Sequence, residues 1–348
     1  MSPSNMRRKL LKNENLSIFL VLLVIIAAVI LVEFFVVRSM DITKVSFVKP
    51  MNIANVLLQV SITGILALSM TLVMISGGID LSVGQMMCFV GTGMAFLIRT
   101  MGWNEWGVAA LGLVVAVVFQ LIMGLIISRT KLESFIVSLG FLSIYKGFTY
   151  LITNGREITI EGKFKLLGRT YLDITPNFRI GAPVLIFIIL TVIVWFLLRY
   201  TKFGRRVYAV GGNESAAYLA GINVKNFKLM LYGINGVFIA IATMAQLSRL
   251  GTGNPLMGEG KEIEVIAAVV VGGTALVGGR GNAWGTFIGV LLLGIISNAL
   301  NILGVNPHWQ YVMRGALIVF AVSLTYFSTL RSEQMGMGNT PMVKQKKE

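Results

Sequence analysis

Apolar runs long enough to cross a bilayer recur along the whole sequence. A helix spans the hydrocarbon core with roughly 20 residues at about 1.5 Å each, and we recognise about ten such runs. The expected spans are Leu16–Val37, Ile53–Ser76, Leu81–Thr100, Trp106–Ser128, Phe135–Thr153, Pro183–Tyr200, Leu229–Leu247, Ile263–Val277, Trp284–Leu303 and Trp309–Leu330. Because lipid cannot satisfy backbone polar groups, such a chain folds as helices. We therefore predict an all-α polytopic membrane protein whose transmembrane domain covers residues 16–330.

Composition excludes several other classes of protein. Hydrophobic residues make up 55% of the chain and charged residues 13%, with a mean hydropathy of +0.80, which is typical of integral membrane proteins. No soluble domain fits between the spans, so we expect no catalytic residue. The net charge of +15 comes from basic residues in separate loops rather than one tract with interleaved aromatics, which argues against nucleic acid. A single Cys88 and a single His308 exclude an internal disulfide and argue against a metal site.

The distribution of basic residues predicts the topology. Lys and Arg concentrate in segments that share one side if both termini are cytoplasmic. This places the tail 1–15, the loop 201–228 and the tail 331–348 inside, and the loop 154–182 outside. The first apolar run follows Arg7-Arg8-Lys9 as in a signal peptide, but it is too long and lacks a small-x-small cleavage site. We expect it to be a retained helix.

The basic loop 201–228 contains a short predicted helix. Asn213 can cap it, Glu214 suits its first turn, alanines favour it, and Gly221 can end it. A small capped helix in the most basic loop of a membrane protein is suited to dock a cytoplasmic partner. The candidate docking residues are Asn213, Glu214, Ser215, Ala216, Ala217 and Gly221.

Two apolar helix pairs, one in each half of the chain, are interrupted by paired glycines. Gly77-Gly78 is followed by Ile79-Asp80-Leu81-Ser82, and Gly272-Gly273 by Thr274-Ala275-Leu276. Interruptions at corresponding positions of two halves indicate a transporter repeat, although such glycines also serve simply to let helices pack closely. The candidate residues of a solute pathway are Gly77, Gly78, Asp80, Ser82, Gly272, Gly273, Asn298 and Asn301.

Each polar residue in the spans has a structural alternative to a pathway role. Asp80 can cap the helix that follows it, and Lys146 can snorkel or pair with a carboxylate. Glu262 and Glu264 suit the first turn of a helix as well as a gate or a binding-protein contact. Amides such as Asn298 hold neighbouring helices together as readily as they bind a hydroxylated solute. The glycine-rich segments match neither a P-loop nor a dinucleotide motif, so the chain is not expected to hydrolyse ATP itself.

Three motif blocks resemble the ribose-type sugar permeases of bacterial ATP-binding-cassette importers. They are Gly77–Gly84, Gly211–Ile222, and Ile266–Leu276 with Gly278–Gly281 and Gly285–Gly289. Their order is that of the family, and the similarity runs from about Asn52 to Tyr326. The chain departs from the family pattern at Ser215, where alanine is usual, and at Lys261–Glu264, where an aromatic-Glu-Leu-Asp run is common.

The resemblance implies a non-catalytic transmembrane subunit of the bacterial inner membrane. A cytoplasmic ATPase would dock on the loop around Glu214, an extracytoplasmic binding protein would deliver a sugar or sugar-like solute, and a second permease copy or a paralogue would complete the pathway. ATP-driven alternating access would then move the solute. The alternative is a secondary transporter of a small polar solute, with Asp80 or Lys146 as the ion-coupling group.

Overall fold

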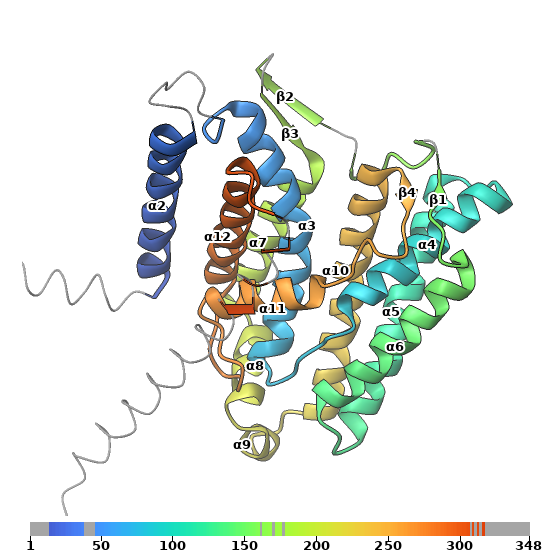
Figure 1. The fold of residues 1–348 in the computed structure, drawn as a ribbon. Helices are drawn as coiled ribbons and strands as arrows, with labels where there is room; N and C mark the ends of the chain where they lie inside the picture. The colour runs from blue at the N-terminus through green and yellow to red at the C-terminus, as the bar shows by residue number, and fades with distance from the viewer. Residues whose placement is uncertain are drawn as a thin grey trace, which may run out of the picture.

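The computed structural model describes residues 14–37, 46–160, 162–168, 171–175 and 178–306, together with 308–309, 312 and 315–316. Most of these residues are helical (Figure 1). The helices are α2 (Glu14–Val32) continued by the π-helical η1 (Glu33–Val37), α3 (Pro50–Ile75), α4 (Val83–Met101), α5 (Glu105–Arg129), α6 (Ser134–Thr153), α7 (Ala182–Tyr200), α8 (Lys202–Gly212), α9 (Glu214–Leu219), α10 (Val224–Leu250), α11 (Lys261–Val271) and α12 (Ala283–Ile302). The strands are β1 (Ile158–Thr159), β2 (Tyr171–Thr175), β3 (Phe178–Gly181) and β4 (Thr252–Gly253).

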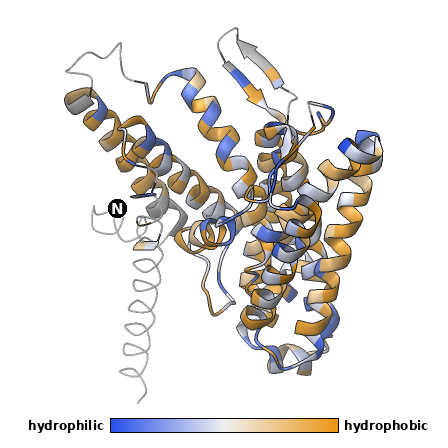
Figure 2. Ribbon diagram, turned by 45° about the vertical axis from the view of Figure 1, so that its right-hand side comes forward, coloured by the Kyte–Doolittle hydropathy of each residue, from blue (hydrophilic) through white to orange (hydrophobic). Residues whose placement is uncertain are grey.

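Seven helices of the described part are long and apolar enough to cross a bilayer: α3, α4, α5, α6, α7, α10 and α12. A shorter apolar stretch, Phe19–Phe35, lies in α2 and η1. Apolar residues run along these helices, and hydrophilic residues lie mostly near their ends and in the connecting segments (Figure 2). The expectation of an all-α polytopic membrane protein is therefore confirmed.

One expected span is shorter in the structure than the sequence indicated. The run Ile263–Val277 contains only α11, whose 11 residues cover about 16 Å and cannot cross the hydrocarbon core. The helix ends at Val271 because Gly272-Gly273 turns the chain. The span Trp309–Leu330 and the tails 1–13 and 331–348 lie wholly or largely outside the described residues. The count of ten spans and the division into two halves stay predictions.

Helix α3 forms the centre of the bundle. Of its most apolar 18-residue window, 89% is buried, against 33% for α5 and for α7. Helices α7, α10, α11 and α12 all pack against α3. The membrane-facing helices therefore surround a helix that is itself shielded from lipid, so that changes at its ends are felt by several neighbours.

Small residues allow the closest helix pair to form. Helix α10 packs along α5, where Gly124 of α5 lies against Tyr232 and Gly236 of α10 lies against the Ala116 backbone. A side chain at either glycine would collide with its neighbour, which explains the small residues at this contact.

The strands and the short helices lie at opposite ends of the bundle. Figure 1 shows the β2–β3 hairpin at one end and α8 and α9 at the other. Strand β1 pairs with β4 in antiparallel register, Ile158 opposite Gly253. The segments 154–182 and 201–228 were expected on opposite sides of the membrane, and this arrangement is compatible with that expectation.

Candidate coupling site and the glycine breaks

Helix α9 is the short helix that the sequence predicted. The Asn213 side chain accepts a hydrogen bond of 2.9 Å from the Ala216 backbone N–H and caps its first turn. At its other end, the N–H groups of Gly221 and Ile222 donate to the carbonyls of Tyr218 and Ala217. This is the Schellman arrangement, and Gly221 takes the left-handed conformation that it needs (φ +83°). Both ends of the helix are therefore fixed by its own sequence.

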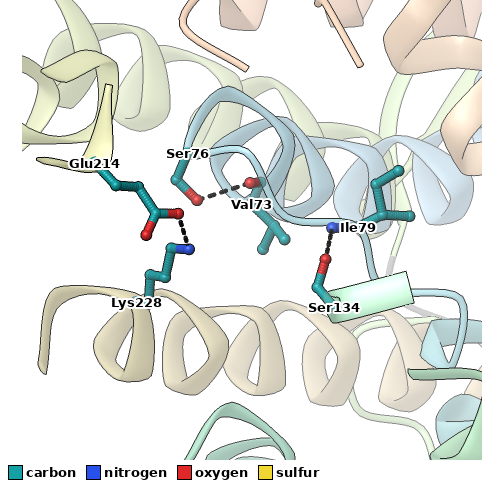
Figure 3. Close-up of polar contacts among 6 residues, drawn as sticks. All are labelled: Val73, Ser76, Ile79, Ser134, Glu214 and Lys228. Carbon is teal, nitrogen blue, oxygen red and sulfur yellow. Dashed lines mark hydrogen bonds and ion pairs between the residues drawn. The ribbon is translucent and has the colours of Figure 1, made fainter. Parts of the chain in front are cut away.

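The outer face of α9 is unusually exposed for its composition. Tyr218 is 70% exposed and Leu219 85% exposed, although both are large apolar side chains. Ala217 is buried and anchors the helix to its neighbours. Glu214 forms an ion pair with Lys228 of α10 (Figure 3), which ties the exposed helix to a transmembrane one. The candidate docking residues Glu214, Ser215 and Ala216 all lie on the exposed side.

We call the interruptions at Gly77-Gly78 and at Gly272-Gly273 the first and the second glycine break. The segment immediately before α9 contacts the chain at the first break and the loop 272–282 that begins at the second. A Cβ atom on Gly211, near the end of α8, would overlap the Ile75 carbonyl oxygen at the end of α3 and lie 2.8 Å from the Gly279 nitrogen. A Cβ atom on Gly278 would lie 2.9 Å from both the Gly211 oxygen and the Gly77 Cα atom. The Gly279 N–H also donates to the Ile75 carbonyl at 2.8 Å. We call this contact of the α3 end, the α8 end and the loop 272–282 the glycine joint.

Two further hydrogen bonds connect the glycine joint to neighbouring helices. The Tyr208 hydroxyl of α8 donates to the Gly281 carbonyl at 2.7 Å, so α8 holds the loop 272–282 at a second point. The Ile79 N–H donates to the Ser134 hydroxyl at 3.0 Å, which connects the first break to the start of α6 (Figure 3). The Ser76 hydroxyl, in contrast, donates to the Val73 carbonyl of the helix that it follows.

Asp80 lies fully buried in the segment between α3 and α4, where its carboxylate accepts four hydrogen bonds. The Ser82 N–H and hydroxyl donate to one oxygen at 2.8 and 2.6 Å, and the Gln120 and Asn235 amides donate to the other at 2.9 and 2.7 Å. Asp80 thus connects the first break to α5 and α10 and does not cap α4, whose N-cap residue is Ser82.

Gly272 at the second break serves close packing in the structure, and the candidates Asn298 and Asn301 lie away from it in the last turns of α12. A Cβ atom on Gly272 would lie 2.5 Å from the Gly285 oxygen, so α11 and α12 approach closely where the chain turns at Gly272-Gly273. Asn298 of α12 and Asn52 of α3 exchange two amide hydrogen bonds, at 2.9 and 3.0 Å. Asn301 is exposed near the end of α12. Of these candidates, Asn298 has the clearest structural task.

Sequence reasoning found the glycine breaks but missed what joins them. It assigned Gly211 and Gly212 to the docking loop, and it gave no role to Tyr208 or to Gln120. A signal was present, because a Gly-Gly pair occurs in each of the three motif blocks. Backbones that meet without side chains between them require such pairs, so their repetition in three distant segments was a hint of mutual contact.

Comparison with known proteins identifies the family of the chain. Residues 52–322 match the family described as the branched-chain amino acid transport system / permease component. The chain belongs to this family. The matched region contains all three motif blocks and the whole glycine joint.

Similar proteins include permeases named for ribose and for xylose. It is 41% identical to the ribose import permease protein RbsC of Bacillus subtilis over 294 residues, covering 84% of this chain and 89% of the relative. The RbsC protein of Escherichia coli K12 is 35% identical over 273 residues, with coverages of 78% and 84%. The xylose transport system permease protein XylH of the same strain is 32% identical over 383 residues, with coverages of 92% and 95%. The resemblance to ribose-type permeases is confirmed.

Proposed function

We propose that this chain is the transmembrane permease subunit of an ATP-binding-cassette importer for a sugar or sugar-like solute. The glycine joint carries the proposal, because it brings the segment before α9 into backbone contact with the end of α3 and with the loop 272–282. A cytoplasmic ATPase that docks on α9 can then act on both breaks at once. The permease itself contributes no catalysis and takes its energy from the ATPase.

The geometry suggests how a displacement of α9 by the docked ATPase would be transmitted to the rest of the permease. The exposed Tyr218 and Leu219 side chains offer apolar area for docking, and tyrosine is among the residue types that contribute most to binding at protein interfaces. Motion of α9 passes to Gly211 and from there to Ile75 and Gly278, whose backbones touch without intervening side chains. A contact of this kind has no rotamers that could absorb the displacement, so it transmits motion more directly than packed side chains would.

The relatives support the identity of the solute and of the partners. Their names record import of ribose and transport of xylose, so we propose a neutral sugar of similar size. An extracytoplasmic binding protein would deliver it at the end that carries β2 and β3, and a second permease copy or a paralogue would complete the pathway. We place the complex in the bacterial inner membrane with both termini in the cytoplasm.

Reconstitution tests the proposal directly. The permease is co-expressed with its ATPase, placed in proteoliposomes with the ribose-loaded binding protein outside, and assayed for uptake of labelled ribose and xylose. We expect uptake that requires ATP and both partners. Uptake by the permease alone under a proton or sodium gradient would instead support the secondary transporter. The full set of donors around Asp80 gives that alternative no vacant coupling group at this position.

A further inference from the structure

A charged ring joins the start of α11 to the middle of α3. The Lys261 ammonium donates to the Thr63 hydroxyl at 3.0 Å and pairs with the Glu264 carboxylate at 2.9 Å. The Thr63 hydroxyl in turn donates to the other Glu264 oxygen at 3.0 Å. Each of the three groups therefore contacts the other two. The side chains of Lys261 and Glu264 remain 19% and 18% exposed, so the ring has an open side.

The position of this ring across the thickness of the membrane determines what its open side faces. Thr63 lies halfway along α3 (Pro50–Ile75), a bilayer-length helix, and Figure 1 shows α11 crossing the bundle at about half its height. Charged groups at the middle of a bilayer are costly and face the protein interior or a water-filled cavity rather than lipid. The exposed part of the ring therefore faces water or a partner subunit at half depth.

Further polar groups surround the same point. Lys146, in the interior of α6, lies 3.7 Å from Glu259, which precedes α11. The Glu262 carboxyl packs against Gly84 at the start of α4, and its Oε2 atom is buried without a hydrogen-bond partner. The starts of α4 and α11 thus meet here, and their positive dipole ends favour a carboxylate between them. Irregular backbone between helices, as in segment 251–260, is tolerated at membrane depth where it lines a cavity.

We infer that the start of α11, with Lys261, Glu264 and Thr63, lines the solute pathway at half depth and contacts a neutral polyhydroxylated solute. This inference rests on the proposed function and adds a site to it. Carboxylate, ammonium and hydroxyl groups together offer acceptors and donors that match sugar hydroxyls, which both donate and accept. The two ammonium groups already pair with Glu264 and Glu259. An anionic solute would therefore find no uncompensated cation.

Cysteine labelling in the assembled importer tests the position of this site. Gln59 lies one turn before Thr63 on the same face of α3 and is exposed, so Gln59→Cys is the probe. Val118, halfway along the membrane-facing α5 and 44% exposed, gives the matched control Val118→Cys. The native Cys88 is the only cysteine and is fully buried, so it contributes no background. The reagent is a membrane-impermeant cationic methanethiosulfonate, applied without nucleotide and with ATP or ADP.

We expect Gln59→Cys to react about tenfold faster than Val118→Cys in at least one nucleotide state, and ribose-loaded binding protein to slow the reaction. No reaction in any state, or equal rates at the two positions, would overturn the assignment to the pathway. Reaction without protection by ribose or xylose would overturn the solute contact. Active uptake by the unmodified importer, measured in parallel, separates each of these results from a failure of the proposed function.

A second variant keeps the test decisive if Gln59→Cys does not assemble. Glu264→Gln keeps the shape of the side chain but removes the charge that pairs with Lys261. We expect about tenfold slower ribose uptake per assembled complex at saturating binding protein. The control Glu133→Gln changes an exposed carboxylate just before α6 that makes no side-chain cap bond. Equal uptake by the two variants would contradict the inference.

Discussion

Replacement of Gly211 by alanine tests whether the glycine joint transmits the motion of α9. The added methyl group would overlap the Ile75 carbonyl oxygen and lie 2.8 Å from the Gly279 nitrogen. Both neighbours are backbone atoms and cannot rotate away. Overpacking of this kind costs about 1–3 kcal/mol, and separating the Gly279 N–H from the Ile75 carbonyl costs about 0.5–1.5 kcal/mol more.

The neighbouring glycine provides a matched control. A Cβ atom on Gly212 would meet no atom within 4 Å, and both glycines belong to α8. Each substitution therefore gains similar helix propensity, up to about 1 kcal/mol, and only Gly211→Ala strains the joint. The net strain is about 2 kcal/mol, which corresponds to about a 30-fold slower step if the strain falls on the conformation that must form during transport.

The assay is ATP-driven ribose uptake in proteoliposomes, expressed per permease–ATPase complex recovered by gel filtration, with ATP hydrolysis measured on the same samples. Normalisation to assembled complex removes any loss caused by lower stability. We expect Gly211→Ala to hydrolyse ATP with little uptake and Gly212→Ala to behave as the unmodified importer. Equal uptake per ATP by the two variants would refute the role of the joint.

Three other substitutions probe the same machinery. Glu214→Lys removes the ion pair with Lys228 and places a cation at a helix N-terminus, so we expect solute-stimulated ATP hydrolysis to be lost; unchanged stimulation would contradict docking at this residue. Tyr208→Phe removes one hydrogen bond to the loop 272–282, worth about 1 kcal/mol, and uptake per ATP should fall about fivefold, whereas an unchanged ratio would make the bond irrelevant to coupling. Asp80→Asn places an amide donor against groups that already donate. The free energy of unfolding, measured by thermal unfolding in detergent, should therefore fall by about 2–4 kcal/mol. A stability equal to that of the unmodified chain would refute the buried network.

Local signals allowed the sequence to predict the helices and their ends. Asn213 and Gly221 act within a few residues, and their capping chemistry depends little on the rest of the fold. Hydropathy similarly located most spans, because lipid imposes the same demand at every position. The short α11 was the exception, since the apolar run continues past Val271 although the backbone turns there.

The contacts between distant segments were beyond such reasoning. Nothing local indicates that Gln120 and Asn235 reach Asp80, or that Lys261 reaches Thr63, because these pairs are separated by 40, 155 and 198 positions. The sequence offered two readings of Asp80, a cap or a pathway group, and the structure supplies its bonding partners.

The six residues of α9 have a consequence for the order of assembly. A helix of this length does not persist in water on its own, because nucleation outweighs the few bonds it gains. Its shape therefore depends on α8 and α10 being in place, through buried Ala217 and the Glu214–Lys228 pair. A nascent or misfolded permease would lack the surface that we propose recruits the ATPase. The docking surface would thus report completed folding, and hydrolysis would be confined to complexes that can use it.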